Sequence, residues 1–311
     1  MKGKCQTMQF ILVLDHGQMT IEKTCSLLNI KGLSMNQVTT IKQIVRGIPT
    51  QDGAGVTLTR IIGQPGLPRL DPFLMLDEFG SDQPQDYLAG FPEHPHRGFQ
   101  TVTYMLAGKM EHRDSSGNTG LIETGGIQWM NAGKGIVHSE MPKQTEGLMR
   151  GFQLWVNLPS HEKMSEPNYQ DIKAAQVPVV RDIAGLEVRV LVGEFKGTLG
   201  PVNAQAVKPV FLDCRFSRDQ SLSLPCEIEH AFFVYCYEGE LTIGNQALLK
   251  GQLAVLEPTT LISLTGSADS KCIIVGGRPI NEPIVQYGPF VMNTEQEIRQ
   301  AFDDYRQGRF A

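Results

Sequence analysis

Apolar and polar residues follow each other in short, strand-like runs along most of this chain. The runs are rich in β-branched and aromatic residues, and they cover 56–63, 99–106, 126–130, 186–193, 210–216, 231–244 and 271–277. Glycine and proline separate them at short intervals, and the chain holds 32 glycines and 18 prolines. Many short strands with such breaks are typical of antiparallel sandwiches and barrels. The pattern therefore predicts an all-β fold.

One segment near the end of the chain carries clear helix signals. Thr294 and Glu297 form a Thr-x-x-Glu capping box, in which each side chain can bind the backbone N–H of the other residue. Apolar residues follow at helical spacing, and Gly308 is a suitable stop. We expect a short C-terminal helix.

Two parts of the chain resemble each other. The segment 104–108 (Tyr-Met-Leu-Ala-Gly) aligns with 235–239 (Tyr-Cys-Tyr-Glu-Gly), and the segment that begins at Gly126 aligns with the one that begins at Gly251. A chain of 311 residues is also long enough for two cores. We therefore expect two β-barrels related by duplication.

The first candidate metal ligands are His94 and His96, in the string Pro-Glu-His-Pro-His. Pro95 disfavours a helix here, and in an extended segment residues i and i+2 point to the same side, about 7 Å apart along the backbone. The two imidazoles can therefore converge on one ion.

A second pair repeats this spacing. His138 and Glu140 are again i and i+2, and Gly133 and Gly135 just before them indicate a tight turn at a barrel mouth. A lone histidine is more often an ordinary core or surface residue, but two matched pairs favour a metal site. Three imidazoles and one carboxylate suit divalent iron, copper, nickel or manganese, and they leave coordination positions open.

The second barrel should lack this site. Ungapped counting from the aligned segments puts Pro225 and Glu227 opposite His94 and His96. The same counting puts Ser263 and Thr265 opposite the second pair. His230 remains nearby, where a structural role is the simpler interpretation.

Composition limits the classes of partner. The net charge is −5, from 28 basic and 33 acidic residues without a dense basic run, so direct nucleic-acid binding is not expected. Six cysteines lack any Cys-x-x-Cys pair, which predicts reduced thiols and no structural disulfides. The longest strongly apolar run near the start, 10–14, is too short for a membrane span. We expect a soluble, cytoplasmic protein, and a monomer because two barrels can cover each other's apolar faces.

Several strings together resemble the pirin family of the cupin superfamily: DPFLMLDEF, FPEHPHRGFQTVTYML, EHRDSSGNTG, IQWMNAGKGIVHSE, FQLWVNLP and YGPFVMNT. The resemblance starts near Met35 and implies a bicupin. It implies Fe²⁺ in an N-terminal barrel (35–165), held by His94, His96, His138 and Glu140, and a metal-free C-terminal barrel (166–311). Residues 1–34 fall outside it, as a poorly ordered extension or a mis-assigned start.

The resemblance extends to quercetin 2,3-dioxygenases. It implies a flavonol-like substrate and dioxygen, with ring opening and loss of carbon monoxide. Glu140 is then either the base that takes the 3-hydroxyl proton or a plain ligand. Copper, nickel, manganese, cobalt or zinc could replace iron. The alternative is a non-enzymatic, iron-dependent redox sensor that acts through a protein partner.

Three further residues have weaker signals. Gln100 stands where many family members have Glu, so an acidic role there is in doubt, although an amide can still orient an imidazole. His112 precedes a turn, and a contact with the site or substrate is the less favoured interpretation. For Arg97 a salt bridge or surface role is favoured over catalysis.

Overall fold

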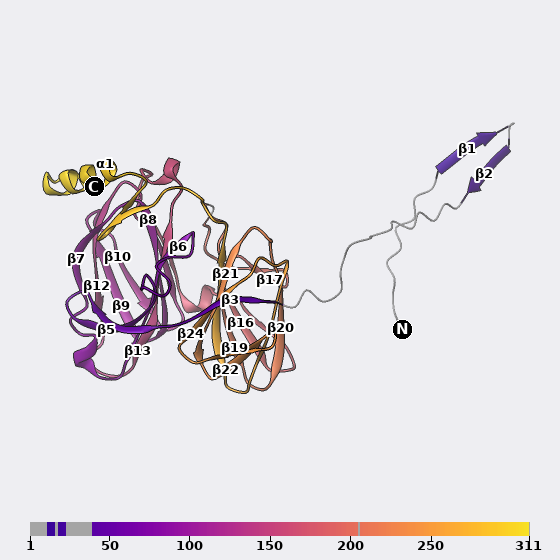
Figure 1. The fold of residues 1–311 in the computed structure, drawn as a ribbon, viewed down its shortest axis with the longest axis horizontal. Helices are drawn as coiled ribbons and strands as arrows, with labels where there is room; N and C mark the ends of the chain where they lie inside the picture. The colour runs from indigo at the N-terminus through magenta and orange to yellow at the C-terminus, as the bar shows by residue number, and fades with distance from the viewer. Residues whose placement is uncertain (1–10, 16–17, 23–38, 205, 311) are drawn as a thin grey trace. The chain divides into compact units, whose positions relative to one another are not determined.

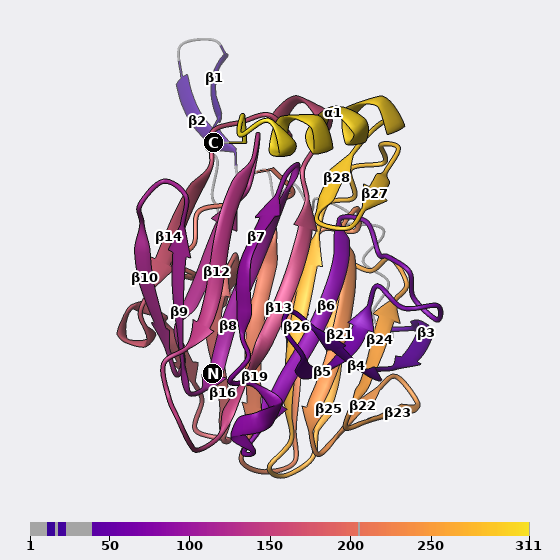
Figure 2. The ribbon, with the colours of Figure 1, turned by 90° about the vertical axis from the view of Figure 1, so that its left-hand side faces the viewer.

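The computed structural model describes residues 11–15, 18–22, 39–204 and 206–310 of the chain. Two compact units are distinguished, Met1–Gln37 and Val38–Ala311. In the first, β1 (Ile11–Asp15) pairs antiparallel with β2 (Gln18–Glu22). The expectation for residues 1–34 otherwise falls outside the described residues, as do Cys5 and Cys25. The all-β prediction is confirmed for the second unit, which contains two barrels (Figures 1 and 2).

The first barrel consists of a seven-stranded and a four-stranded antiparallel sheet. The larger sheet has the order β14-β11-β8-β13-β6-β5-β4 and the smaller has the order β10-β9-β12-β7. The strands of the larger sheet are β4 (Ile48–Asp52), β5 (Val56–Ile62), β6 (Phe73–Ser81), β8 (Phe99–Ala107), β11 (Ile127–Asn131), β13 (Met149–Asn157) and β14 (Asn168–Ile172). Those of the smaller sheet are β7 (Phe91–His96), β9 (Lys109–Asp114), β10 (Thr119–Glu123) and β12 (Ile136–Pro142).

The second barrel repeats this plan. Its larger sheet has the order β15-β16-β19-β26-β21-β24-β3 and its smaller one β20-β25-β22-β23. The larger contains β3 (Ile41–Arg46), β15 (Val179–Arg181), β16 (Leu186–Val192), β19 (Val210–Phe216), β21 (Ala231–Glu238), β24 (Gln252–Leu256) and β26 (Lys271–Gly277). The smaller contains β20 (Gln220–Pro225), β22 (Glu240–Ile243), β23 (Gln246–Leu249) and β25 (Leu261–Gly266).

The strand order of the first large sheet, read from β4 to β14, corresponds to that of the second, read from β15 to β3. The aligned Tyr-to-Gly segments lie at the ends of β8 and β21, which take the same place in the two sheets, so the structure supports the duplication. The correspondence includes an unexpected pairing. Strand β3 precedes the first barrel in the chain, but it pairs with β24 of the second.

The two barrels share one apolar core between their large sheets. Tyr104 and Phe152 of the first barrel belong to the same buried cluster as Phe211 and Tyr235 of the second. Inside this contact Asp213 is fully buried and accepts hydrogen bonds from the hydroxyl groups of Tyr104 and Tyr237. The buried carboxylate is thus satisfied by groups from both barrels.

The ungapped count into the second barrel was out of register. Along β20 and β25 the buried, inward side chains are Leu222, Leu224, Ile262 and Leu264, whereas Ser263 is half-buried and Pro225 and Thr265 are exposed. A slip of one residue moves every side chain of a strand to the other face, and an ungapped count cannot detect it. Apolar side chains therefore fill the second barrel.

The predicted helix is α1 (Glu295–Arg306), with the Thr294 and Glu297 capping box formed in both directions. The helix ends at Arg306, just before the predicted stop. Its Ile298 packs with Phe290 of β28 (Phe290–Met292), which pairs with β27 (Val285–Tyr287). Figure 2 shows α1 beside β27 and β28 at one end of the first barrel.

The remaining elements are short. They are β17 (Glu194–Phe195), β18 (Thr198–Leu199) and the 3-10 turns Pro84–Asp86, Ser160–Glu162 and Ala174–Gln176. The four cysteines within the described ranges, Cys214, Cys226, Cys236 and Cys272, are free thiols. No described helix has the length and apolar character needed to cross a membrane.

Candidate metal centre

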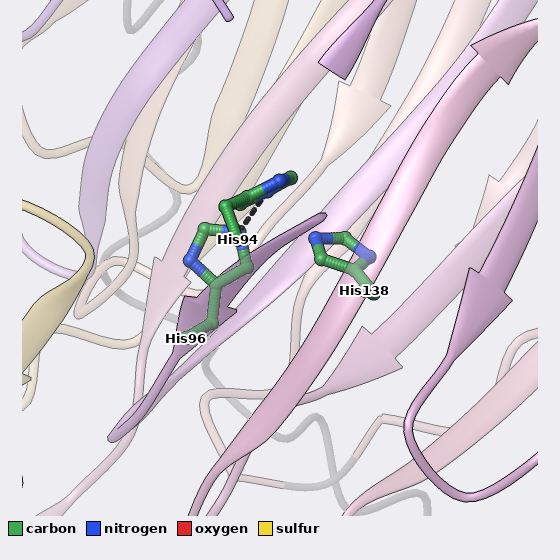
Figure 3. A group of neighbouring side chains, drawn as sticks. All are labelled: His94, His96 and His138. Atoms are coloured by element: carbon green, nitrogen blue, oxygen red, sulfur yellow. Dashed lines mark hydrogen bonds between the residues drawn. The ribbon is translucent and has the colours of Figure 1, made fainter. Parts of the chain in front are cut away.

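Three of the predicted ligands meet on the small sheet of the first barrel. His94 and His96 lie on β7 and His138 on the adjacent β12, directly opposite His94. One nitrogen of each ring lies within 4.8 Å of the others, and Figure 3 shows the three rings facing a common point. It is the one such group of His, Cys, Asp and Glu side chains found in the described part of the chain. Strand alternation and one strand pairing therefore produce the convergence.

Hydrogen bonds orient two of the rings. His94 Nδ1 donates to the Pro92 carbonyl at 2.8 Å, which leaves His94 Nε2 with its lone pair, 3.0 Å from His96 Nε2. His138 Nδ1 lies 3.2 Å from His112 Nδ1, while His138 Nε2 is buried without a hydrogen-bond partner. The rings thus turn unprotonated or unpaired nitrogen atoms toward one another, as metal ligands do.

Burial favours the neutral form of two of these rings, His96 and His138. Burial and then the nearby His94 ring hold the pKa of His96 well below its usual 6.5. Burial, followed by the rings of His96, His94 and His112, does the same for the pKa of His138. A neutral imidazole is the form that can coordinate a metal. The His96 ring packs edge-on against Phe99 and Trp155, with ring centroids 5.0 and 5.2 Å away.

Glu140 is placed differently from the histidines. Its side chain is buried and lines the same cavity as His94 and His96, but it is not part of the group within 4.8 Å. Its Oε1 accepts a hydrogen bond of 2.9 Å from the hydroxyl of Thr103. The pairing between β12 and β7 is irregular between His138 and Glu140, so Glu140 lies opposite Phe91. Its role as a ligand stays a prediction.

A cavity of about 800 Å³ opens beside the histidines. Its walls include the apolar side chains of Met75, Phe79, Phe91, Met110 and Trp155, and the polar side chains of Arg60, Asp77 and Gln153. Pockets of roughly 300–1,000 Å³ with few polar groups are typical of small-molecule sites. Two residues of the candidate metal centre, His94 and His96, thus lie in the wall of a space large enough for a small molecule.

Sequence reasoning missed the polar wall of this cavity. Arg60 donates from Nε and Nη2 to the two carboxylate oxygens of Asp77, at 2.9 and 2.8 Å. Burial raises the pKa of Asp77, although the Arg60 hydrogen bond opposes that shift. The sequence did contain a signal for this pair. Arg60 interrupts the apolar strand VTLTRII, and Asp77, of opposite charge, ends the apolar run FLMLD.

Comparison with known proteins follows the same lines. The sequence model of the Pirin family matches residues 55–156, and that of the Pirin C-terminal cupin domain matches residues 211–311. The chain belongs to the pirin family. A pirin-like protein of Caulobacter vibrioides is 46% identical over 271 residues, which cover 87% of this chain and 98% of that protein.

Two further comparisons are with proteins whose names state an activity. A Pseudomonas aeruginosa protein, provisionally named a quercetin 2,3-dioxygenase, is 45% identical over 284 residues, covering 89% of this chain and all of that protein. A crystal structure of quercetin 2,3-dioxygenase from Acinetobacter baumannii is 34% identical, with a TM-score of 0.82 over 88% of this chain and 99% of the other. The bicupin fold expected of a pirin is therefore confirmed.

The structure also shows where the other residues that the sequence analysis considered for the site lie. Arg97 is buried and forms an ion pair with Asp304, as the favoured interpretation predicted. His112 contacts His138, which had been the less favoured one. Gln100 is buried, and its Oε1 has no hydrogen-bond partner. His230 donates from Nε2 to the Lys208 carbonyl at 3.1 Å, which fits a structural role.

Proposed function

We propose that this chain is a metal-dependent dioxygenase of the quercetin 2,3-dioxygenase type. His94, His96, His138 and Glu140 would hold one Fe²⁺ ion. The observation that carries the proposal is the convergence of three histidines, two of which, His94 and His96, line a cavity of about 800 Å³. Similarity to a solved protein named quercetin 2,3-dioxygenase supports the choice of reaction.

The donor atoms fit a divalent transition metal. The Nε2 atoms of His94 and His96 are 3.0 Å apart, and the buried His138 Nε2 has no partner, so a cation between the rings would satisfy all three. Imidazole and carboxylate ligands accept Fe²⁺, and they also accept copper, nickel, manganese, cobalt and zinc. Metal supply would therefore influence which ion is bound.

Glu140 would act as the base toward the flavonol 3-hydroxyl. Thr103 donates to Oε1 of this carboxylate, so the lone pairs of Oε2 would serve both the metal and the proton. The phenol-like anion left behind is delocalised into the ring that dioxygen attacks, and ring opening releases carbon monoxide. When bound, the metal would supply Lewis acidity and a redox path between the two substrates.

The cavity walls would bind and orient the flavonol. Phe79 and Trp155 offer flat apolar surfaces for its rings and exclude water. Gln153 can donate hydrogen bonds to its hydroxyl groups or accept from them, and Arg60 can donate to them. The substrate class is therefore a small aromatic molecule with several hydroxyl groups.

The test is an assay of iron-loaded protein with quercetin under air, with carbon monoxide as the readout. We expect release by the wild type and its loss in His94→Ala. His161→Ala is the matched control, because His161 is exposed. Fully loaded wild-type protein that releases no carbon monoxide would contradict the proposal and favour a regulator that acts through protein partners.

A further inference from the structure

His112 lies directly behind the metal centre. It is on β9, the neighbour of β12 on the side away from β7, and in the register of the two strands it faces Glu140. Its side chain is 1% exposed, and its ring centroid is 4.9 Å from that of His138. Three adjacent strands therefore present three neighbouring imidazoles, those of His94, His138 and His112.

The two Nδ1 atoms of His112 and His138 are 3.2 Å apart. A hydrogen bond between two such atoms needs one proton, so one ring donates and the other accepts. If His138 donates, its proton is on Nδ1 and its Nε2 carries a lone pair toward the metal centre. The buried, partnerless state of His138 Nε2 fits this arrangement. His112 then accepts at Nδ1 and carries its own proton on Nε2.

The outer side of His112 suits a proton on Nε2. The Asp114 side chain is fully buried, and its Oδ2 lies 3.8 Å from His112 Nε2, which is too far for a hydrogen bond but close enough for its negative charge to favour a proton on that nitrogen. That carboxylate is itself fixed, because its Oδ1 accepts from the backbone N–H groups of Ser116 and Asn118 at 2.7 and 3.1 Å. The Tyr169 ring covers the other side of His112, with centroids 4.6 Å apart. His112 thus has a charged neighbour and little room to rotate.

We propose that His112 is a positioning residue that holds His138 with its proton on Nδ1 and its Nε2 directed at the metal. His112 is not itself part of the group of converging nitrogens, and its Nδ1 is already used by His138. Ligating histidines commonly donate their second N–H to a carboxylate, a carbonyl or water, and loss of that partner lowers metal affinity 10–100-fold. Here a second imidazole takes that place, with Asp114 behind it.

The inference rests on the metal site of the proposed function, so it is tested on metal binding. Co²⁺ is added to metal-free full-length protein, and its affinity is measured by competition with a chelator while its visible absorption reports ligand geometry. In His112→Leu we expect about 10–100-fold weaker binding and a shifted spectrum. In His112→Asn the side-chain oxygen can still accept from His138, so both properties should stay near those of the wild type.

The outcomes separate the two proposals. Wild-type protein that binds no Co²⁺ would remove the metal site, and this inference with it. Normal binding with an unchanged spectrum in His112→Leu would overturn only the role of His112. Equal losses in His112→Asn and His112→Leu, with unchanged melting of the metal-free protein, would show a packing effect and also overturn it. If His112→Leu does not fold, His112→Asn is compared with the control His161→Leu. Co²⁺ affinity and a spectrum near those of the wild type in His112→Asn would support the positioning role of His112, and a loss of affinity would overturn it.

Discussion

Arg97, the residue after the second histidine of the site, forms a buried ion pair with Asp304 of helix α1. The two side chains are 2.8 Å apart, and the Arg97 guanidinium also lies 4.3 Å from the centre of the Phe310 ring. Its Nε donates to the Lys134 carbonyl in the turn before β12. One side chain therefore connects the end of the chain with both segments that carry the histidines.

Replacing Asp304 by Asn should destabilise the protein by about 3 kcal/mol near neutral pH, because the Arg97 charge stays buried without its partner. The Arg97 hydrogen bond is the largest cause that lowers the pKa of Asp304, to about 2. A lowered carboxylate pKa contributes stability above the unfolded value, and the contribution is lost as pH falls toward the folded value.

The difference in the free energy of unfolding between wild type and Asp304→Asn should therefore be largest at pH 7 and decrease between about pH 4 and pH 2. Urea unfolding at several pH values measures it. Asp303→Asn is the control, since Asp303 forms only an exposed pair with Arg306. Equal free energies of unfolding for the two variants would contradict the prediction.

Lys163 should make stability rise in mildly alkaline solution. Its side chain is 1% exposed, and Nζ donates to the carbonyls of Gly98 and Val291 and to Asn157 Oδ1. Burial lowers the pKa of Lys163 to about 8. Between about pH 8 and pH 10 the unfolded chain holds this proton while the folded protein has lost it, so the free energy of unfolding rises with pH.

Lys163→Met should lack this rise and cost about 3 kcal/mol at pH 7, because three oxygen atoms lose their donor. Urea unfolding from pH 7 to pH 10 gives both quantities. The exposed Lys250 provides the control, as Lys250→Met. A constant difference between wild type and Lys163→Met across this range would refute the assignment.

Gly98→Ala should disturb the turn that follows His96. The residue has φ of +85°, and a Cβ there would clash with the Val291 backbone oxygen. Gly117→Ala is a close control, since its φ is +84° and nothing lies within 4 Å of the added Cβ. Both variants should be destabilised by about 1–2 kcal/mol, because alanine disfavours the left-handed backbone conformation. Gly98→Ala should lower the free energy of unfolding by about 2 kcal/mol more than Gly117→Ala, and it should lower the metal bound at the proposed site. Thermal melting and metal analysis test this, and equal behaviour of the two variants would be the contrary result.

Thr103→Val should impair Glu140, the proposed base, rather than the fold. Valine has nearly the same shape, but it cannot donate to Glu140 Oε1, so the carboxylate would lose its orientation. We expect carbon monoxide release to fall about 10–100-fold, with smaller changes in melting temperature. Thr242→Val, at an exposed position of the second barrel, should match the wild type. An unchanged turnover rate in Thr103→Val would argue against Glu140 as the base.

Local patterns in the sequence predicted the features that depend on residues close together in the chain. The capping box at Thr294 predicted α1, and the i, i+2 spacing of His94 and His96 predicted that their rings share a face. The repeated segments predicted two barrels, and the resemblance to the pirin family added that they are of the cupin type.

Features that depend on strand register could not be predicted. The contact of His112 with His138 arises because β9 and β12 pair side by side, although 26 residues separate the two histidines. For the same reason, the ungapped count into the second barrel was wrong by one residue. It assigned Ser263 to the inner face of the strand, which Ile262 and Leu264 occupy. Only the assembled sheets fix such relationships.

Strand β3 has a consequence for how the molecule can be divided. Strand β3 leads the chain into the half with the three histidines but pairs within a sheet of the other half, and the hydroxyl groups of Tyr104 and Tyr237 both donate to the Asp213 carboxylate between the halves. A cut at the midpoint of the sequence would leave one fragment with an unpaired strand and both with an exposed aromatic surface. The two halves should therefore unfold in a single cooperative transition, and the half that carries the three histidines should not survive as an excised fragment.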